Sequence, residues 1–111
     1  PMMYVLQRGD TNKRGFLSNP EQWDSDVAEA LASAEDLDLT DTHWVVLKTI
    51  RTLYEQSEAP TSYHVLCQEL GDTLVPFRYG CIHAMKQLFP GGGIKQAARI
   101  AGVPDHFCFG C

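Results

Sequence analysis

The stretch KQAARIAGVPDHFCFGC, residues 95–111, decides how the rest of the chain is organised. Its first part has the residue spacing of a short helix, and Gly102 followed by Pro104 is the usual order of signals that end a helix. Two cysteines, Cys108 and Cys111, follow on the short tail. Because an exposed thiol near a chain end is a chemical liability unless it is used, the tail is expected to carry chemistry.

Length and composition indicate one ordinary globular domain. The chain has 111 residues, of which 44% are hydrophobic and 21% are charged. A chain of this length and composition can bury a hydrophobic core without disulfide bonds or a bound metal. We expect a single domain over residues 1–103 and a flexible C-terminal arm over residues 104–111. Fourteen acidic and nine basic residues give a net charge of −5, which disfavours strong direct binding of nucleic acid.

The sequence also suggests a compartment. No apolar run is long enough to cross a membrane, and the first residues lack the basic and then apolar pattern of a secretion signal. We therefore expect a cytoplasmic protein in a reducing setting. Cys67 and Cys81 fall within helical patterns, where they are read as small buried apolar residues rather than as part of a disulfide framework.

The expected fold is mostly α (α+β), with an N-terminal β-hairpin or small meander packed on about five helices. The hairpin would pair residues 2–6 with residues 14–17 across a turn-rich centre. Apolar residues at helical spacing, with capping and stop signals, place the helices at about residues 19–34, 41–59, 62–70, 78–89 and 94–101. Val65 and Ile82 are expected to face the core.

A glycine triplet, residues 91–93, separates the last two expected helices. It is not a phosphate loop, because it follows a helix and lacks the G-x-x-x-x-G-K-[ST] spacing. We interpret it as a hinge that would let the last helix and the tail reorient.

The C-x-x-C of Cys108 and Cys111 is the sharpest chemical signal. A structural zinc site needs four ligands, and the scattered histidines, His43 among them, supply no second spaced pair, so no metal is expected. A thioredoxin-like pair would open a helix, whereas this one follows a helix. His43, at a helix start, is read as a capping or packed residue, and no hydrolytic constellation or cofactor site can be placed.

The remaining interpretation is that the thiols bind a transferred group covalently, and a flexible tail is well suited to this role. A sulfur carrier must accept sulfur in one pocket and present it in another, which a slim peptide does readily. Phe107 and Phe109 could anchor such a tail in a partner's channel or pack back onto the body. Three nearby groups can carry positive charge and could contact a partner, namely Lys95, Arg99 and His106.

Many residues along the chain resemble the DsrC/TusE family, the gamma-subunit-like proteins of dissimilatory sulfite reductase and their sulfur-relay relatives in tRNA 2-thiolation. The resemblance covers nearly the whole chain in order and rests on Gly15-Phe16-Leu17, Trp23, Leu39-Thr40, His43-Trp44-Val45, Arg51, Tyr54, Ala59-Pro60, Arg78-Tyr79, Leu88-Phe89-Pro90, Gly92 or Gly93, Lys95-Gln96-Ala97 and Ile100-Ala101-Gly102-Val103-Pro104. It implies a hairpin-plus-helices fold and an arm whose cysteine carries sulfur as a persulfide.

The resemblance also implies the partners and the site. Family members accept sulfur from a donor complex and deliver it to a tRNA-thiolating enzyme or engage a sulfite reductase. Cys111 is our first choice as the carrier and Cys108 as the resolving thiol, although either could carry the sulfur. Arg78 joins Lys95, Arg99 and His106 as an expected partner-binding residue.

The chain departs from the family pattern in the arm. Reductase-type members have a second arm cysteine directly before the basic residue of the IAG segment, and Ala98 stands there in this chain. The usual carrier lies five residues after the proline, whereas Cys108 and Cys111 lie four and seven residues after Pro104. His64 replaces a usual basic residue, and Asp105-His106 replaces a lysine-proline pair.

Two functions are therefore expected from the sequence. The first is a sulfur carrier, a sulfurtransferase-type covalent carrier rather than a stand-alone enzyme. The alternative is a noncatalytic interaction subunit of a sulfite reductase or sulfurtransferase complex, with arm cysteines that sense redox state.

Overall fold

The computed structural model describes residues 4–57, 63–71, 80–104 and 107. Within these ranges the chain is mostly helical, as expected from the sequence. A short 3-10 turn, η1, is followed by five α-helices, whose bounds are η1 Pro20–Gln22, α1 Ser25–Ala34, α2 Asp41–Ser57, α3 Tyr63–Leu70, α4 Gly80–Leu88 and α5 Ile94–Ile100.

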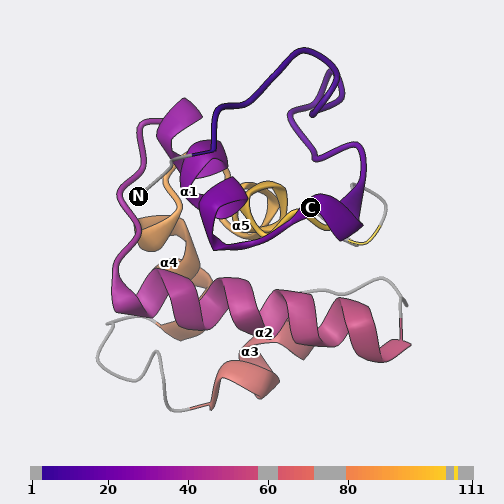
Figure 1. Ribbon diagram of the computed structural model, residues 1–111. Helices are drawn as coiled ribbons and strands as arrows, with labels where there is room; N and C mark the ends of the chain where they lie inside the picture. The colour runs from indigo at the N-terminus through magenta and orange to yellow at the C-terminus, as the bar shows by residue number, and fades with distance from the viewer. Residues whose placement is uncertain (1–3, 58–62, 72–79, 105–106, 108–111) are drawn as a thin grey trace.

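Helix α2 is the long element on which the other helices are arranged. Figure 1 shows it crossing the molecule, with α1 and α5 on one side and α3 on the other. Its buried positions are His43, Val46, Leu47 and Ile50, which recur at the three- and four-residue spacing of one helix face. The core therefore lies along this face of α2.

Helix α5 is the most deeply enclosed element, and it packs against both α1 and α2 (Figure 1). Five of its seven residues are buried, namely Ile94, Gln96, Ala97, Ala98 and Ile100. The small alanine side chains let neighbouring helices approach closely. Ala98, the position at which reductase-type members would have a cysteine, is 2% exposed and belongs to this core.

The glycine triplet forms the turn between α4 and α5, and its interpretation as a hinge stays a prediction. Gly92 and Gly93 have φ angles of 145° and 63°, which an L side chain adopts only with strain, so glycine is needed there to turn the chain. The helix that follows the turn is enclosed by the core, and a reorientation of α5 would expose its buried side chains to water.

The expected N-terminal β-hairpin is not shown by the structure. Among the described residues the pairing is one antiparallel bridge between Thr11 and Leu17, and no strand is formed. Side chains hold the turn instead, since Asn12 Oδ1 accepts from the backbone N–H groups of Arg14 and Phe16. Residues 2 and 3 of the expected first strand lie outside the described residues.

Further side-chain bonds fix the chain before this turn. The Tyr4 hydroxyl donates to Asp10 Oδ2 at 2.7 Å, and the Gln7 N–H donates to the same oxygen at 2.7 Å. These bonds, first that from Tyr4 and then that from Gln7, lower the pKa of Asp10. A loop satisfied by side chains in this way does not need a partner strand.

The expected first helix is broken into two pieces. Asn19 caps η1, as predicted for a helix start at this position, but the chain becomes extended again at Trp23. Asp24 then caps α1 by accepting a hydrogen bond from the Val27 N–H at 2.9 Å. A second capping residue inside the apolar pattern thus separates the two pieces.

Candidate functional site

The expected arm thiols, Cys108 and Cys111, lie outside the described residues, as do His106 and Arg78. Phe107, next to Cys108 in the sequence, is described, and so are residues 80–104. The structure therefore shows the part of the body that directly precedes the cysteine segment in the sequence, which we call the base of the arm.

Phe107 is packed onto the body. Its side chain is 1% exposed, and its ring meets the ring of Tyr54 on α2 edge to face, with centroids 5.3 Å apart. Its backbone N–H donates to the Pro104 carbonyl oxygen at 3.0 Å. Of the two positions left open for this phenylalanine, the structure selects packing against the body.

Arg51, one turn before Tyr54 on α2, holds the end of α5. Its Nη1 lies 3.3 Å from the carbonyl oxygens of both Ala101 and Gly102, and donates to them. A cation at a helix C-terminus is favoured there by the partial negative charge of unpaired carbonyl groups. The guanidinium also lies over the Trp23 ring, 4.9 Å from its centroid.

Burial changes the electrostatics of Arg51. Its side chain is 12% exposed, and its Nε is buried without a hydrogen-bond partner among the described residues. Desolvation lowers the pKa of the guanidinium, while the neighbouring Glu55 and Tyr54 act in the opposite direction. An arginine starts from so high a pKa that the group remains a cation.

Trp23 also contacts the end of α5 and the residues that follow it. Its indole N–H donates to the Ile100 carbonyl oxygen at 2.8 Å. The indole also lies so close to Gly102 that a Cβ at that position would collide with it. Gly102 has a φ of 72°, so both its conformation and its neighbour require glycine.

Lys95 and Arg99 occupy different environments on α5. Lys95 is exposed, so its ammonium group is available to a partner. Arg99 is engaged within the molecule, since its Nη2 lies 2.7 Å from Glu35 Oε1 and its Nε lies 3.1 Å from Glu35 Oε2. Its Nη2 also donates to the Gly91 carbonyl oxygen at 3.2 Å.

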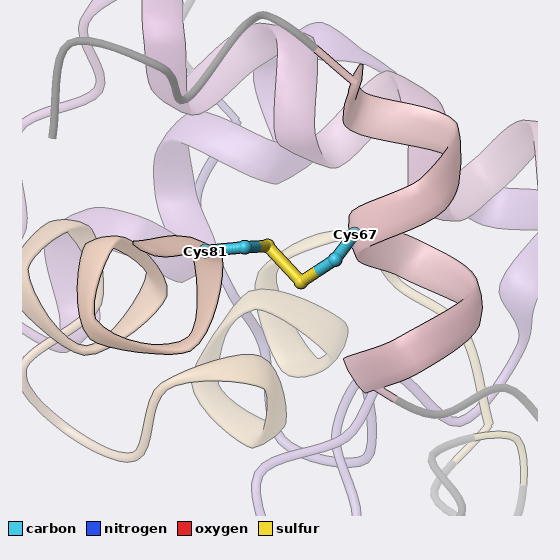
Figure 2. The surroundings of a disulfide bond; sticks show 2 residues. All are labelled: Cys67 and Cys81. Atoms are coloured by element: carbon cyan, nitrogen blue, oxygen red, sulfur yellow. A yellow bond between two sulfur atoms is a disulfide. The ribbon is translucent and has the colours of Figure 1, made fainter. Parts of the chain in front are cut away.

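The reading of Cys67 and Cys81 as separate buried thiols is wrong. Their sulfurs form a disulfide that joins α3 to α4, with Cα atoms 5.9 Å apart (Figure 2). Both residues are half-buried. Each lies on a helix, as expected, but a spacing of 14 residues gave no local signal that the two helices would bring them together.

Sequence reasoning assigned no role to several residues that build this base. Arg51, Tyr54 and Trp23 were given no part in supporting the arm, yet they hold the chain that precedes the thiols. An arginine within the apolar face of α2 was the available signal, because a charged residue is seldom buried unless it is paired.

The described residues contain no group of three His, Cys, Asp or Glu side chains that could hold a metal ion. Cys108 and Cys111 lie outside the described residues, so the absence of a metal site at the C-x-x-C stays a prediction. None of the described helices is long and apolar enough to cross a membrane.

Comparison with known proteins identifies the family. The family model described as DsrC like protein matches residues 6–109, which is nearly the whole chain. The chain therefore belongs to the DsrC-like family, and the resemblance seen in the sequence is confirmed.

Similar proteins carry a functional name, and two of them are described here. The chain is 34% identical over 95 residues to the sulfurtransferase TusE homolog of Haemophilus influenzae. The matched region covers 86% of this chain and 86% of the relative. It is 33% identical over 107 residues to the sulfurtransferase TusE of Photorhabdus laumondii, over 93% of this chain and 92% of the relative.

The fold is shared with a solved structure of the family. The crystal structure of the oxidized gamma-subunit of the dissimilatory sulfite reductase (DsrC) from Archaeoglobus fulgidus superimposes with a TM-score of 0.80 at 28% identity. The superposition covers 100% of this chain and 99% of that one. The two chains therefore share one overall architecture.

Proposed function

We propose that this protein is a sulfur carrier, which accepts persulfide sulfur on an arm cysteine and passes it to an acceptor in a sulfur relay. The observation that carries the proposal is family membership over residues 6–109, with relatives of similar length named sulfurtransferase TusE. The cargo then follows from the chemistry of thiols, since a thiolate is the nucleophile that takes sulfur from a persulfide.

The transfer step conserves atoms and charge. The Cys111 thiolate attacks the outer sulfur of a donor persulfide, R–S–SH, so that a new sulfur–sulfur bond forms as the donor bond breaks. The products are Cys111–S–SH and the donor thiolate R–S⁻. Delivery repeats the step with the acceptor's thiolate as the nucleophile, and no external oxidant or reductant is needed.

Cys108 supplies a second way to release the sulfur. Its thiolate can attack the inner sulfur of the Cys111 persulfide, forming a Cys108–Cys111 disulfide and expelling HS⁻. Two cysteines separated by two residues are suitably spaced for such a local pair, as in other C-x-x-C segments. In this proposal Cys111 is the carrier and Cys108 the resolving thiol.

The partners are a sulfur-donor complex and a sulfur acceptor, either a tRNA-thiolating enzyme or a sulfite reductase. We assign partner binding to Lys95, Arg99, His106 and Arg78. Lys95 is the better supported of the two described residues, because it is exposed, whereas Arg99 already pairs with Glu35. The net charge of −5 supports contact with proteins rather than direct contact with tRNA. A cytoplasmic location fits this relay.

Mass spectrometry after incubation with glutathione persulfide tests the carrier function. We expect increments of about 32 Da on the C-terminal peptide, because each transferred sulfur atom adds that mass. Cys111→Ser should abolish loading and Cys108→Ser should retain it, with Cys67→Ser/Cys81→Ser as the matched control that loads normally. Normal loading of Cys111→Ser would move the carrier to Cys108.

A second function is favoured by the full-length match to a sulfite reductase gamma-subunit. The chain could serve as a noncatalytic interaction subunit whose arm cysteines report redox state. Intact mass distinguishes the two functions after mild oxidation and persulfide treatment. A sensor would show only the loss of two hydrogens, about 2 Da, for each disulfide formed, whereas a carrier retains extra sulfur.

A further inference from the structure

The Cys67–Cys81 disulfide joins two helices that the core holds to different degrees. Figure 2 shows the bond running from the middle of α3 to the first turn of α4, with Cα atoms 5.9 Å apart. Both residues are half-buried, so part of the surface of the pair stays in contact with solvent. The proposed sulfur transfer does not use this pair, because its carrier and its resolving thiol lie on the arm.

Helix α4 is held on the body by its own contacts. Its buried side chains are Ala84, Met85 and Leu88, and Phe89 directly after the helix is buried as well. The Leu88 carbonyl oxygen also lies 2.7 Å from Nε2 of the buried His43 on α2. Opening the disulfide removes none of these contacts, so we expect α4 to keep its place when the bond is broken.

Helix α3 has fewer such contacts. Leu66 and Leu70 are its buried side chains among those that the structure describes. The exposed ones are His64, Val65, Gln68 and Glu69. Glu69 also lines an open groove of about 280 Å³ together with residues of α2, so part of the α2–α3 interface is not closed by packing. An isolated helix of eight residues is unstable in water, and α3 therefore depends on its contacts with the body.

The disulfide strengthens this weak docking by limiting how far α3 can move from α4. In the chain-entropy account, closing a loop over a separation of 14 residues favours the closed arrangement by about a hundredfold in the equilibrium constant. An effect of this size is large for a short helix with two buried leucines. The redox state of the pair therefore controls the docking of α3 far more than that of α4.

We propose that the Cys67–Cys81 pair is a second redox site of this protein, at which a dithiol reductant opens the bond and so allows α3 to leave the body while the other helices stay folded. The proposed cytoplasmic setting supports this role, because disulfides in reducing compartments are usually transient and take part in catalysis or in redox sensing. The inference rests on that setting and is independent of sulfur transfer by the arm.

The exchange at this site balances without a further reactant. One thiolate of the dithiol attacks a sulfur of the pair, so that a mixed disulfide forms and the other cysteine leaves as a thiolate, which takes up a proton. The second thiolate of the reductant then attacks the mixed disulfide and releases the first cysteine. Two electrons and two protons pass to the pair, and the reductant becomes a disulfide. A small disulfide such as oxidised glutathione reverses the exchange and is itself reduced to two thiols.

Reduction under native conditions tests whether the site is reactive. The variant Cys108→Ser/Cys111→Ser leaves Cys67 and Cys81 as the only cysteines of the full chain. Dithiothreitol is the reductant, N-ethylmaleimide traps the free thiols, and intact mass counts them. We expect both thiols to be trapped faster than the chain unfolds globally, with the global rate obtained by extrapolating unfolding in urea to the same buffer. Oxidised glutathione should restore the bond.

Hydrogen exchange then tests whether the bond controls α3. Reduction should speed amide exchange in α3 by about a hundredfold, because loop closure no longer restrains the helix. In the reduced protein this exchange should be insensitive to low concentrations of urea, whereas α5 should exchange through urea-sensitive global unfolding. Adding Cys67→Ser/Cys81→Ser to the same variant is the matched control. Its α3 should exchange at the faster rate from the start and should not respond to dithiothreitol.

Three results would overturn the site. A bond that is reduced only as fast as the chain unfolds would be a purely structural cross-link. Unchanged exchange in α3 after reduction, or exchange with the same urea dependence as α5, would show that the bond does not control this helix separately. Loss of helical circular dichroism over the whole chain would show that it holds the entire body. No readout involves persulfide, so failure of this site and failure of the carrier function can be told apart.

Discussion

A single buried histidine joins two distant parts of the chain. His43 is 6% exposed, and its Nε2 lies 2.7 Å from the Leu88 carbonyl oxygen at the end of α4. Because a carbonyl oxygen only accepts, Nε2 carries the proton. Nδ1 is then the acceptor for the Thr40 N–H, 3.1 Å away, and for the Thr40 hydroxyl, 2.7 Å away. The sequence prediction of a packed or capping residue is confirmed.

We expect His43→Ala to destabilise the protein by about 2–4 kcal/mol, since it leaves a cavity and unpaired polar groups in the core. Urea unfolding followed by circular dichroism measures this difference. His64→Ala is the matched control, because His64 is exposed on α3 and its removal should change stability by less than about 0.5 kcal/mol. Equal stability of the His43→Ala protein would show that the buried bonds to Thr40 and Leu88 contribute nothing net.

The elements of this fold could be predicted from the sequence to the extent that local patterns decide them. Helices α2 to α5 lie where apolar spacing and stop signals placed them. Val65 and Ile82 were wrongly placed in the core, and they are 38% and 50% exposed. A helix of eight or nine residues has few turns, so spacing alone leaves open which of two neighbouring faces is buried.

The candidate site was less predictable than the helices. The end of α5 is held by contacts between residues far apart in sequence, such as Arg51 with Gly102 and Trp23 with Ile100. No local sequence pattern encodes these pairs. The C-x-x-C itself was visible at once, because its residues are neighbours. The sequence thus indicates the chemical groups, while the contacts that hold the chain before them become visible only in the structure.

Helix α5 is joined to α1 through a partly buried polar cluster. Glu35, the residue after α1, accepts hydrogen bonds from both Gln96 and Arg99, and Gln96 Oε1 accepts from the Gly91 N–H at 2.8 Å. The Arg99 and Glu35 side chains are 14% and 26% exposed. The Glu35 carboxylate thus accepts a hydrogen bond from the one buried glutamine of the described core.

We expect Glu35→Ala to cost about 1–3 kcal/mol, because it leaves Gln96 and Arg99 without their shared acceptor in a partly desolvated place. Hydrogen exchange at residues 91–97 should rise with the loss of stability measured in urea. Glu29→Ala removes an exposed carboxylate from the same helix and should change neither. If Glu35→Ala costs no more than Glu29→Ala, the cluster is a surface contact without energetic weight.

At the scale of the whole molecule, the Cys67–Cys81 disulfide stabilises the packing of α3 on the rest of the fold. Helix α3 has eight residues, too few to be stable alone in water, and Leu66 and Leu70 are its buried leucines. The Cys67–Cys81 bond links it to α4, whose last carbonyl group receives the bond from His43. The proposed cytoplasmic setting is reducing, so the same chain would meet conditions in which this link opens.

Reduction of this bond should lower stability without preventing persulfide loading. Closing a loop over a separation of 14 residues contributes about 3 kcal/mol in the chain-entropy account, so a reductant should lower the free energy of unfolding by that amount. Cys67→Ser/Cys81→Ser should start at the lower value and be insensitive to the reductant. A parent protein whose urea midpoint does not move on reduction would show that α3 is held by its buried leucines alone.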